Sequence, residues 1–298
     1  MATTDEQCVQ LLQWALPRLQ LRWPGFRKVR RQVRRRLNRR LRELGLRDTS
    51  DYRVYLESHS EEWPILDRLC QISLSRFYRD RSVFDQLRDE ILPALAQAVT
   101  TCGKKEVSCW SAGCASGEEV YTLAILWKTH VSPRFPEISL RQVATDANEQ
   151  LLGRARRACY AAGSLKDVPP DWLGKAFVCH GQEYVVRAEF RTGIEFRQQD
   201  IRKELPDGPF HLVLCRNLVF TYFAEELQQR ILGQIRQHML PDSFLVIGKQ
   251  EQLPADAERL SLCGRNTRIH RSIEAGSNVK DSRRFAGHRG VDDSCCAK

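Results

Sequence analysis

The sequence contains no apolar run long enough to cross a membrane and no export signal at its start. We therefore expect a cytoplasmic protein that does not insert into membranes. Its eleven cysteines are scattered, with no CxxC pair and no histidine at metal-ligand spacing to a cysteine pair. This distribution favours reduced, structural thiols, and we predict no metal site.

A stretch of small residues lies between a predicted strand and a predicted helix. Val107–Trp110 is a short apolar run, residues 111–117 read SAGCASG, and apolar residues recur at helical spacing after Glu118 and Glu119. Strand, glycine turn and helix form the opening unit of a nucleotide-type α/β domain. No Lys-Ser/Thr pair follows the second glycine, which excludes a P-loop. An acidic helix start would repel a pyrophosphate and suits an ammonium group, so S-adenosylmethionine fits better than NAD or ATP.

A second predicted strand, Leu140–Asp146, ends in an acid. In α/β cofactor domains a carboxylate at this place accepts hydrogen bonds from the ribose hydroxyls. The segment Asp146–Asn148 could equally cap the helix that begins at Glu149, and both roles can coexist. The two strand ends together favour a bound cofactor.

Positive charge is concentrated in one predicted helix. Residues 24–47 hold eleven Lys and Arg against one acid, which accounts for the whole net charge of +10. Apolar residues three or four positions apart form a single stripe on this helix, namely Val29, Val33, Leu37, Leu41 and Leu44. A positive face this dense usually signals an acidic partner, either nucleic acid or an acidic helical protein. No aromatic residues lie among the arginines, which weakens the case for single-stranded nucleic acid.

The order of predicted elements divides the chain into three parts. Residues 1–82 are expected to form an all-helical N-terminal domain, residues 83–274 an α/β domain, and residues 275–298 a disordered tail. Two short β runs around a glycine turn at 176–191 predict a small antiparallel insertion. Further helices are expected over 4–22, 26–44, 149–159 and 224–239, and further strands over 193–200, 209–217, 244–248 and 268–273.

Six motifs, in this order, resemble the CheR-type methyltransferases. They are LSRFYRD (74–80), SAGCASGEEVYTLAI (111–125), ATDAN (144–148), ARRACY (155–160), GPFHLVLCRN (208–217) with TYF (221–223), and LPDSFLVIGKQEQLP (240–254). That family uses S-adenosylmethionine to methylate glutamate side chains of bacterial chemotaxis receptors. The resemblance covers roughly residues 10–273. It implies a class I, Rossmann-like methyltransferase domain with an all-helical N-terminal domain and a small inserted antiparallel β-subdomain.

The resemblance also implies roles for single residues. Arg79 and Tyr222 match the positions beside the reacting groups, and Arg79 could hold either the substrate carboxylate or the cofactor. The positions expected to bind the cofactor are Ser73, Ser75, Arg79, Gly113, Gly117, Glu119, Asp146, Asp200, Ile201, Arg216 and Asn217.

We therefore predict a monomeric, S-adenosylmethionine-dependent protein-glutamate O-methyltransferase. Methyl transfer from a sulfonium needs alignment more than it needs an acid or a base. The expected substrate is an acidic, chemoreceptor-like helical protein that docks on Arg31, Arg35 and Arg39. Two alternatives stay open: a cofactor-free scaffold whose basic helix binds acidic partners, and a nucleic-acid methyltransferase. The intact glycine turn and strand-end acids argue against the first, and the lack of a recognisable RNA-binding module argues against the second.

Overall fold

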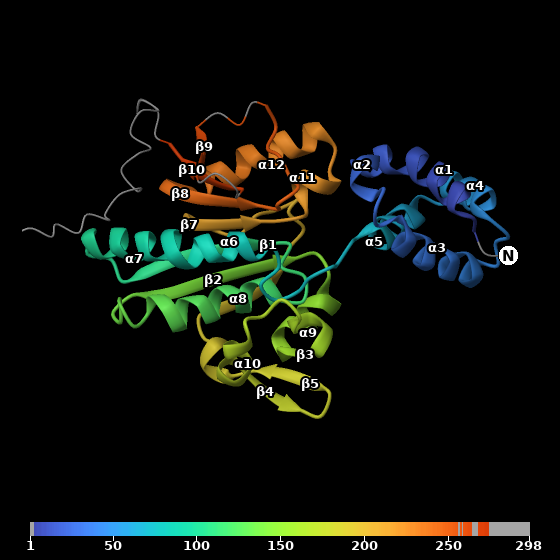
Figure 1. Ribbon diagram of the computed structural model, residues 1–298. Coiled ribbons are helices and arrows are strands. Elements are labelled where there is room, and N and C mark those ends of the chain that lie inside the picture. The colour runs from blue at the N-terminus through green and yellow to red at the C-terminus, as the bar shows by residue number, and fades with distance from the viewer. Residues whose placement is uncertain (1–2, 256, 258, 264–267, 274–298) are drawn as a thin grey trace, which may run out of the picture.

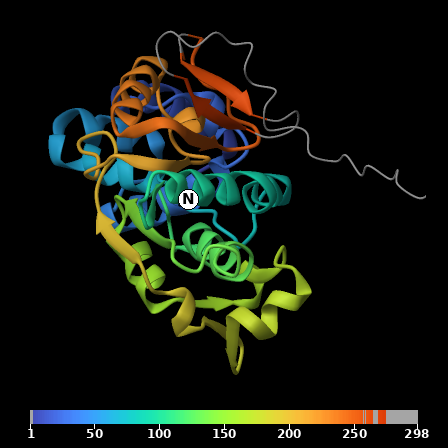
Figure 2. The same ribbon diagram turned by 90° about the vertical axis from the view of Figure 1, so that its left-hand side faces the viewer.

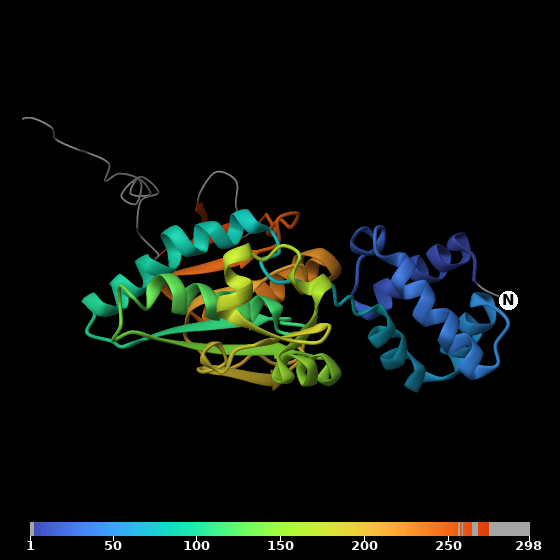
Figure 3. The ribbon, with the colours of Figure 1, turned by 60° about the horizontal axis from the view of Figure 1, so that its bottom comes forward.

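A computed structural model describes residues 3–255, 257, 259–263 and 268–273, so the tail predicted at 275–298 lies outside the described residues. A helical N-terminal part lies beside a part built on a twisted sheet, and the extended segment 71–80 connects them (Figures 1 and 3). This segment contacts both parts, so the domain boundary predicted at residue 82 stays a prediction. None of the described helices combines the length and the apolar character needed to span a bilayer.

The helical part consists of five helices. They are α1 (Asp5–Ala15), α2 (Trp23–Phe26), α3 (Arg30–Leu44), α4 (Thr49–Ser58) and α5 (Trp63–Cys70). The single helix predicted over 4–22 is wrong beyond Ala15. A 3₁₀ turn with Pro17 near its start follows α1, and Gln20 then takes a left-handed conformation (φ 55°), which ends the helical run.

Helix α3 confirms the predicted amphipathic pattern of the basic helix. Val33, Leu37 and Leu41 are buried, whereas the predicted stripe members Val29 and Leu44 are only partly buried. The helix ends at Gly45, whose φ of 68° is left-handed and whose N–H bonds back to Arg42 O. Its apolar side therefore belongs to the core, and its arginines occupy the remaining faces.

The main sheet has the strand order β6-β2-β1-β7-β8-β10-β9. The pairs from β6 to β8 are parallel, and β10 is antiparallel to both of its neighbours. The strands are β1 (Glu106–Ala112), β2 (Ser139–Asp146), β6 (Ile194–Gln198), β7 (Phe210–Cys215), β8 (Met239–Ile247), β9 (Leu260–Cys263) and β10 (Ile269–Ser272). The accompanying helices are α6 (Arg81–Gln86), α7 (Leu92–Thr101), α8 (Glu118–Leu126), α9 (Glu149–Arg157), α10 (Pro170–Ala176), α11 (Val219–Tyr222) and α12 (Glu225–Gln237).

The two faces of the sheet carry separate cores. Along β1, Val107 and Cys109 join the core formed with α6, α7 and α8, whereas Trp110 and Ala112 join the core formed with α12. Alternate side chains of a strand point to opposite faces, which explains this division. The second core continues into the helical part through residues such as Leu21, so the two parts share buried apolar surface.

A separate three-stranded antiparallel sheet has the order β3-β5-β4 and lies at the bottom of both ribbon views (Figures 1 and 2). Its strands are β3 (Cys159–Ala161), β4 (Phe177–His180) and β5 (Glu183–Val186). The predicted hairpin, β4 and β5, is confirmed. The third strand, β3, was not predicted, and its first residue, Cys159, was assigned to the helix predicted over 149–159. That helix ends at Arg157 because Ala158 takes a left-handed conformation (φ 54°). Together, the helical part, the Rossmann-like sheet and the small antiparallel sheet confirm the predicted fold class.

Other element predictions need correction as well. The elements α10, α11 and β9 were not predicted, because segments of four to seven residues are too short to show a clear periodicity. Strand β8 begins at Met239, five residues before the predicted start at Phe244. Asp242 adopts φ 56° within this strand, where the pairing with β7 shifts register, and an Asp-Ser pair of this kind is easily taken for a turn.

Candidate active site

Two adjoining clefts lie where β1, β2 and β7 end and where segment 71–80 crosses the sheet. The first cleft is bordered by residues of the helical part, of β2 and of the segment after β6, and it includes Asp146 and Tyr222. The second is bordered by Arg79, Glu119 and Arg216. Both share the same central wall, formed by Ile72, Ser73, Gly113, Ala115 and Asn217. The predicted residue Ser75 lines the second cleft, and Asp200 and Ile201 line the first.

Both glycines of the turn after β1 have left-handed backbone conformations and leave no room for a side chain. Gly113 has φ 69°, and a Cβ there would lie 2.5 Å from the Leu218 side chain. Gly117 has φ 89°, and a Cβ there would lie 2.9 Å from Cβ of Ala155, so helix α9 explains this glycine. Gly117 does not border either cleft, and its predicted role in cofactor binding stays a prediction.

Asp146 ends β2 beside this turn. Its Oδ2 accepts a hydrogen bond from Ala115 N at 2.9 Å, and its Oδ1 accepts one from Asn148 N at 2.9 Å. Burial raises the pKa of Asp146, while these two backbone donors act in the opposite direction. Helix α9 is capped by Asn148, whose side chain accepts from Gln150 N and Leu151 N. The alternative role of helix cap therefore belongs to Asn148, and Asp146 orders the turn and faces the first cleft.

Asp200 takes part in an ion-pair network that sequence analysis missed. Arg202 donates to both oxygens of Asp200, from Nε at 2.9 and 3.1 Å and from Nη2 at 2.7 Å. It also donates to both oxygens of Asp67 in α5, from Nη1 at 2.9 Å and from Nη2 at 2.7 Å. Burial alone would raise the pKa of Asp200, but the hydrogen bonds and charge of Arg202 outweigh it and lower the pKa. Asp200 is thus held as an acceptor for Arg202, and the network ties this wall of the first cleft to the helical part.

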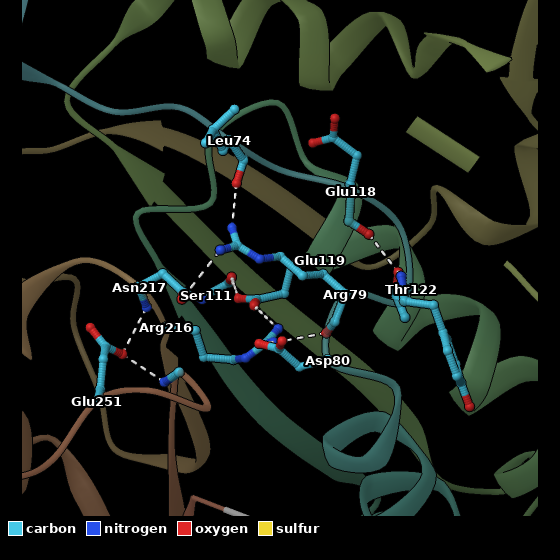
Figure 4. Close-up of polar contacts among 12 residues, drawn as sticks. Leu74, Arg79, Asp80, Ser111, Glu118, Glu119, Thr122, Arg216, Asn217 and Glu251 are labelled. Atoms are coloured by element: carbon cyan, nitrogen blue, oxygen red, sulfur yellow. Dashed lines mark hydrogen bonds and ion pairs between the residues drawn. The ribbon is translucent and has the colours of Figure 1, made fainter. Parts of the chain in front are cut away.

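Arg216 is the most enclosed charged group of the second cleft (Figure 4). Its side chain is 3% exposed and lies over the Phe84 ring, 5.0 Å from the centroid. Nη1 donates to Glu119 Oε2 at 2.7 Å, and Nη2 donates to Asp80 Oδ2 at 2.8 Å. The other oxygen of Glu119 accepts from Ser111 Oγ at 2.7 Å. Both oxygens of Glu119 are therefore already engaged by the protein.

Arg79 occupies the mouth of the second cleft. Its Nη1 donates to Leu74 O at 2.5 Å, and its Nη2 lies 3.4 Å from Asn217 Oδ1 (Figure 4). Leu74 is 53% exposed, so this guanidinium lies between a solvent-facing loop and the strand end. The fold thus brings Arg79 next to Arg216 and Asn217, which lie 137 and 138 positions later in the chain.

Glu251 supports the strand end that carries Asn217, and the sequence analysis did not single it out. Its Oε2 accepts from Asn217 N at 2.7 Å and from Gly248 N at 2.6 Å, and its Oε1 accepts from Thr221 Oγ1 at 2.7 Å. The carboxylate is buried, and burial raises the pKa of Glu251. It fixes the left-handed Asn217 (φ 56°) and the start of the loop that carries Tyr222. In the sequence, only the place of Glu251 in motif 240–254 pointed to it, because no local spacing links Glu251 to Asn217, 34 positions earlier.

The predicted docking arginines lie on α3 and away from these clefts. Arg31, Arg35 and Arg39 are exposed, and Arg35 and Arg39 border a surface groove that Gln32, Arg36 and Arg42 complete. Other arginines of α3 are used internally, since Arg30 pairs with Asp5 and Arg40 with buried Glu62. The exposed positive surface of α3 is therefore narrower than the arginine count suggests.

The donors and acceptors in the clefts fit an adenosyl cofactor that carries an amino acid. Gln199 borders the first cleft, and its buried Oε1 has no hydrogen-bond partner among the described residues, so it can accept from an exocyclic amine. Asp146 stands at a strand end, where a diol can approach it. Gly113 borders both clefts without a side chain, so a ligand can lie against the backbone there. The part of the chain that the structure describes holds no cluster of three or more His, Cys, Asp or Glu suited to a metal ion.

A Rossmann-like sheet with this cleft at its carboxyl edge, completed by a helical part and a small antiparallel sheet, defines an S-adenosylmethionine-dependent methyltransferase. Comparison with family models gives the same class. Residues 73–269 match the model described as "CheR methyltransferase, SAM binding domain", and residues 28–66 match "CheR methyltransferase, all-alpha domain". The chain belongs to the CheR methyltransferase family.

Similar proteins include several enzymes named for chemotaxis. A chemotaxis protein methyltransferase of Escherichia coli is 30% identical over 233 residues, which cover 76% of this chain and 77% of that protein. One of Listeria innocua is 33% identical over 63% of this chain and 69% of its own length. An uncharacterized 104.1 kDa protein of Rhodobacter capsulatus is 31% identical over 82% of this chain, but the match spans only 26% of that larger protein.

Replacing Asp146 with Ala is expected to weaken S-adenosylmethionine binding, because the predicted ribose acceptor is lost. A hydrogen bond to a charged acceptor contributes about 1.5–3 kcal/mol, which corresponds to roughly 10- to 150-fold in Kd. Isothermal titration measures the change. Glu149→Ala is the control, since Glu149 is an exposed acid of the following helix that pairs with Arg156. Parent-like affinity in a folded Asp146→Ala protein would remove Asp146 from the cofactor site.

Proposed function

We propose that this chain is a protein-glutamate O-methyltransferase that acts on an acidic, helical, chemoreceptor-like protein. The observation that carries the proposal is Arg79 at the mouth of the second cleft, beside Asn217 and at the solvent-facing end of the site. A guanidinium with several donors is suited to hold a carboxylate in a defined orientation. The names of the similar chemotaxis enzymes support a receptor as the substrate.

The state of the other polar groups supports a substrate that is already anionic. Both oxygens of Glu119 are bonded to Arg216 and Ser111, and Glu251 accepts from Asn217 N, Gly248 N and Thr221. Burial raises the pKa of Tyr222, so its hydroxyl stays protonated at neutral pH. No histidine is among the described residues that border either cleft. Because no described histidine borders the clefts and the carboxylates of Glu119 and Glu251 are already engaged, the site suits an acceptor that needs no deprotonation, and a carboxylate meets this condition.

We assign the cofactor's parts to the two clefts by their chemistry. S-adenosylmethionine, when bound, supplies an electrophilic methyl group on a sulfonium. In this assignment Asp146 accepts from the ribose hydroxyls, and Gln199 and Ile201 border the adenine. Glu119, Ser73 and Ser75 lie on the side that suits the amino-acid end. Asn217, which is common to both clefts, and Tyr222 would then flank the reacting atoms, and Arg79 would orient the acceptor carboxylate.

The exposed arginines of α3 are assigned to substrate docking. Arg31 and Arg35 form no ion pair within the described residues, and Arg39 approaches Glu43 only at 3.7 Å. Arg36 connects this helix to the site, because it donates to Leu69 O at 3.0 Å and to Gln71 O, at the start of the segment that lines the clefts. A row of positive charge at this position would attract an acidic helix and orient it toward Arg79.

The central test is the chemical nature of the product. A purified acidic receptor fragment is incubated with the protein and with S-adenosylmethionine labelled in the methyl group. Glutamyl methyl esters release labelled methanol in alkali, whereas methylated bases of nucleic acid do not. Alkali-stable label on RNA or DNA, with none on protein, would contradict the proposal. Failure to bind the cofactor would favour the scaffold alternative instead.

Arg79→Ala is expected to lower kcat by roughly 100-fold, because a poorly oriented acceptor loses the alignment on which the displacement depends. Turnover is measured with the receptor fragment, and thermal unfolding verifies that the protein is folded. Arg81→Ala is the control, since Arg81 is exposed and only two residues away in the chain. Normal turnover in Arg79→Ala would show that Arg79 is not catalytic.

Replacing Arg31, Arg35 and Arg39 together with Ala is expected to raise KM for the receptor fragment. The increase should be larger at low salt, because screening weakens the attraction that the parent uses. Cofactor affinity should not change, since these residues lie outside both clefts. Steady-state kinetics at two ionic strengths measure the effect.

The matched control removes three positive charges elsewhere, from exposed Lys128, Arg134 and Arg230. If both variants raise KM equally, net charge rather than the α3 surface is responsible. An unchanged KM for the α3 variant at low salt would mean that its arginines are only a solvated face.

A further inference from the structure

Segment 20–26 of the helical part is hydrogen-bonded to residues 219–224, which comprise α11 with Tyr222 and the two residues after it; these residues are called the Tyr222 loop. Arg22 N donates to Tyr222 O at 2.8 Å, and Ala224 N donates to Gln20 O at 2.8 Å. Leu21 pairs with Phe223 as an isolated antiparallel bridge. Helix α2 lies beside α11 in Figure 1, although about 200 residues of chain separate them. The helical part is thus connected by main-chain hydrogen bonds to the loop of the proposed active site.

The side chain of Arg22 adds a second set of bonds to the same loop. Its Nε donates to Thr221 O at 3.2 Å, and its Nη2 donates to Phe220 O. Both carbonyls belong to α11, a four-residue helix. The last carbonyls of a helix have no partner within it and need donors from elsewhere. Arg22 supplies these donors with side chain and main chain together, and a guanidinium suits this task because its planar fork reaches two acceptors at once.

Close packing, in addition to these hydrogen bonds, fixes the position of residues 219–224. A Cβ at Gly25 would lie 2.3 Å from Thr221 O, so only glycine allows the two backbones to approach this closely. The Phe26 and Tyr222 rings pack with centroids 5.2 Å apart. From the sheet side, Glu251 accepts from Thr221 Oγ1. The loop is therefore held between Glu251 and the helical part.

We propose that Arg22 is a positioning residue for Tyr222, so that the helical part completes the active site in addition to docking substrate. This inference rests on the proposed function, in which Tyr222 flanks the reacting atoms. Loss of Arg22 frees two carbonyls of α11 and lets the loop shift, and a small misplacement in an active site costs catalysis far more than it costs stability.

The first experiment measures the loop itself and needs no substrate. Hydrogen–deuterium exchange of residues 219–224 is compared among the parent, Arg22→Ala, Arg22→Lys and Arg18→Ala. Arg18 is the control because it is exposed in the same helical part and donates to Trp14 O at 2.7 Å instead of to α11. Exchange in Arg22→Ala should accelerate roughly tenfold, with a smaller effect in Arg22→Lys and none in Arg18→Ala.

The second experiment measures coupling to Tyr222 through turnover. Arg22→Ala should lower kcat by roughly 10- to 100-fold. In a Tyr222→Phe background the same change should have little further effect, because residues that act through one another are not additive. A purely structural role for Arg22 would give additive losses in this cycle and would overturn the proposal.

Gly25→Ala disturbs the same contact without loss of charge, so it replaces Arg22→Ala if that variant does not fold. Parent-like exchange over 219–224 in the folded variants overturns the inference. If the parent methylates no glutamate substrate, the proposed function fails, and the exchange data alone then decide the inference: acceleration confined to 219–224 supports it.

Discussion

The buried guanidinium of Arg216 is the interaction on which the site depends. Removing such a charge from water costs several kcal/mol unless it is well paired. Its partners are Glu119 at the start of α8, Asp80 before α6 and the carbonyl of Arg79 at 2.8 Å. These groups come from separate elements, so their bonds to one cation fix the strand end, the helix start and the crossing segment relative to one another. This constraint shapes the chemistry of the site, because the carboxylates of Glu119 and Asp80 are bonded to Arg216, while the guanidinium of Arg79 faces the second cleft.

That arrangement separates positioning from reactivity. Glu119, Asp200 and Glu251 are carboxylates, and each is bonded to an arginine or to backbone donors. Their negative charge serves to hold arginines and turns in place. The reactive partners must therefore be supplied by the ligands, which suits a displacement between a sulfonium and a carboxylate. The protein contributes shape, hydrogen-bond donors and alignment.

Sequence patterns predicted those parts of the site whose positions are set by the order of strands and helices. Asp146 is the last residue of one parallel strand and Asn217 follows another. The carboxyl ends of such strands meet at one edge of the sheet, so their proximity could be expected. The stripe at Val33, Leu37 and Leu41 was equally readable from helical spacing. What could not be predicted depends on tertiary contact alone. The bond from Arg202 to Asp67 joins residues 135 positions apart, and the bonds from Arg22 to α11 join residues about 200 apart, with no local signal in either segment.

The extended segment 71–80 has a consequence for how this protein can diverge. It is the covalent link between the two parts and also a wall of both clefts, through Ile72 and Ser73. Domain boundaries usually fall in linkers that few contacts cross, whereas this linker forms part of the wall of both clefts. A helical part taken from a relative would have to bring segment 20–26 into register with residues 219–224 of its new host. The two parts are thus expected to be inherited as a pair, with substitutions on one side of the junction compensated on the other.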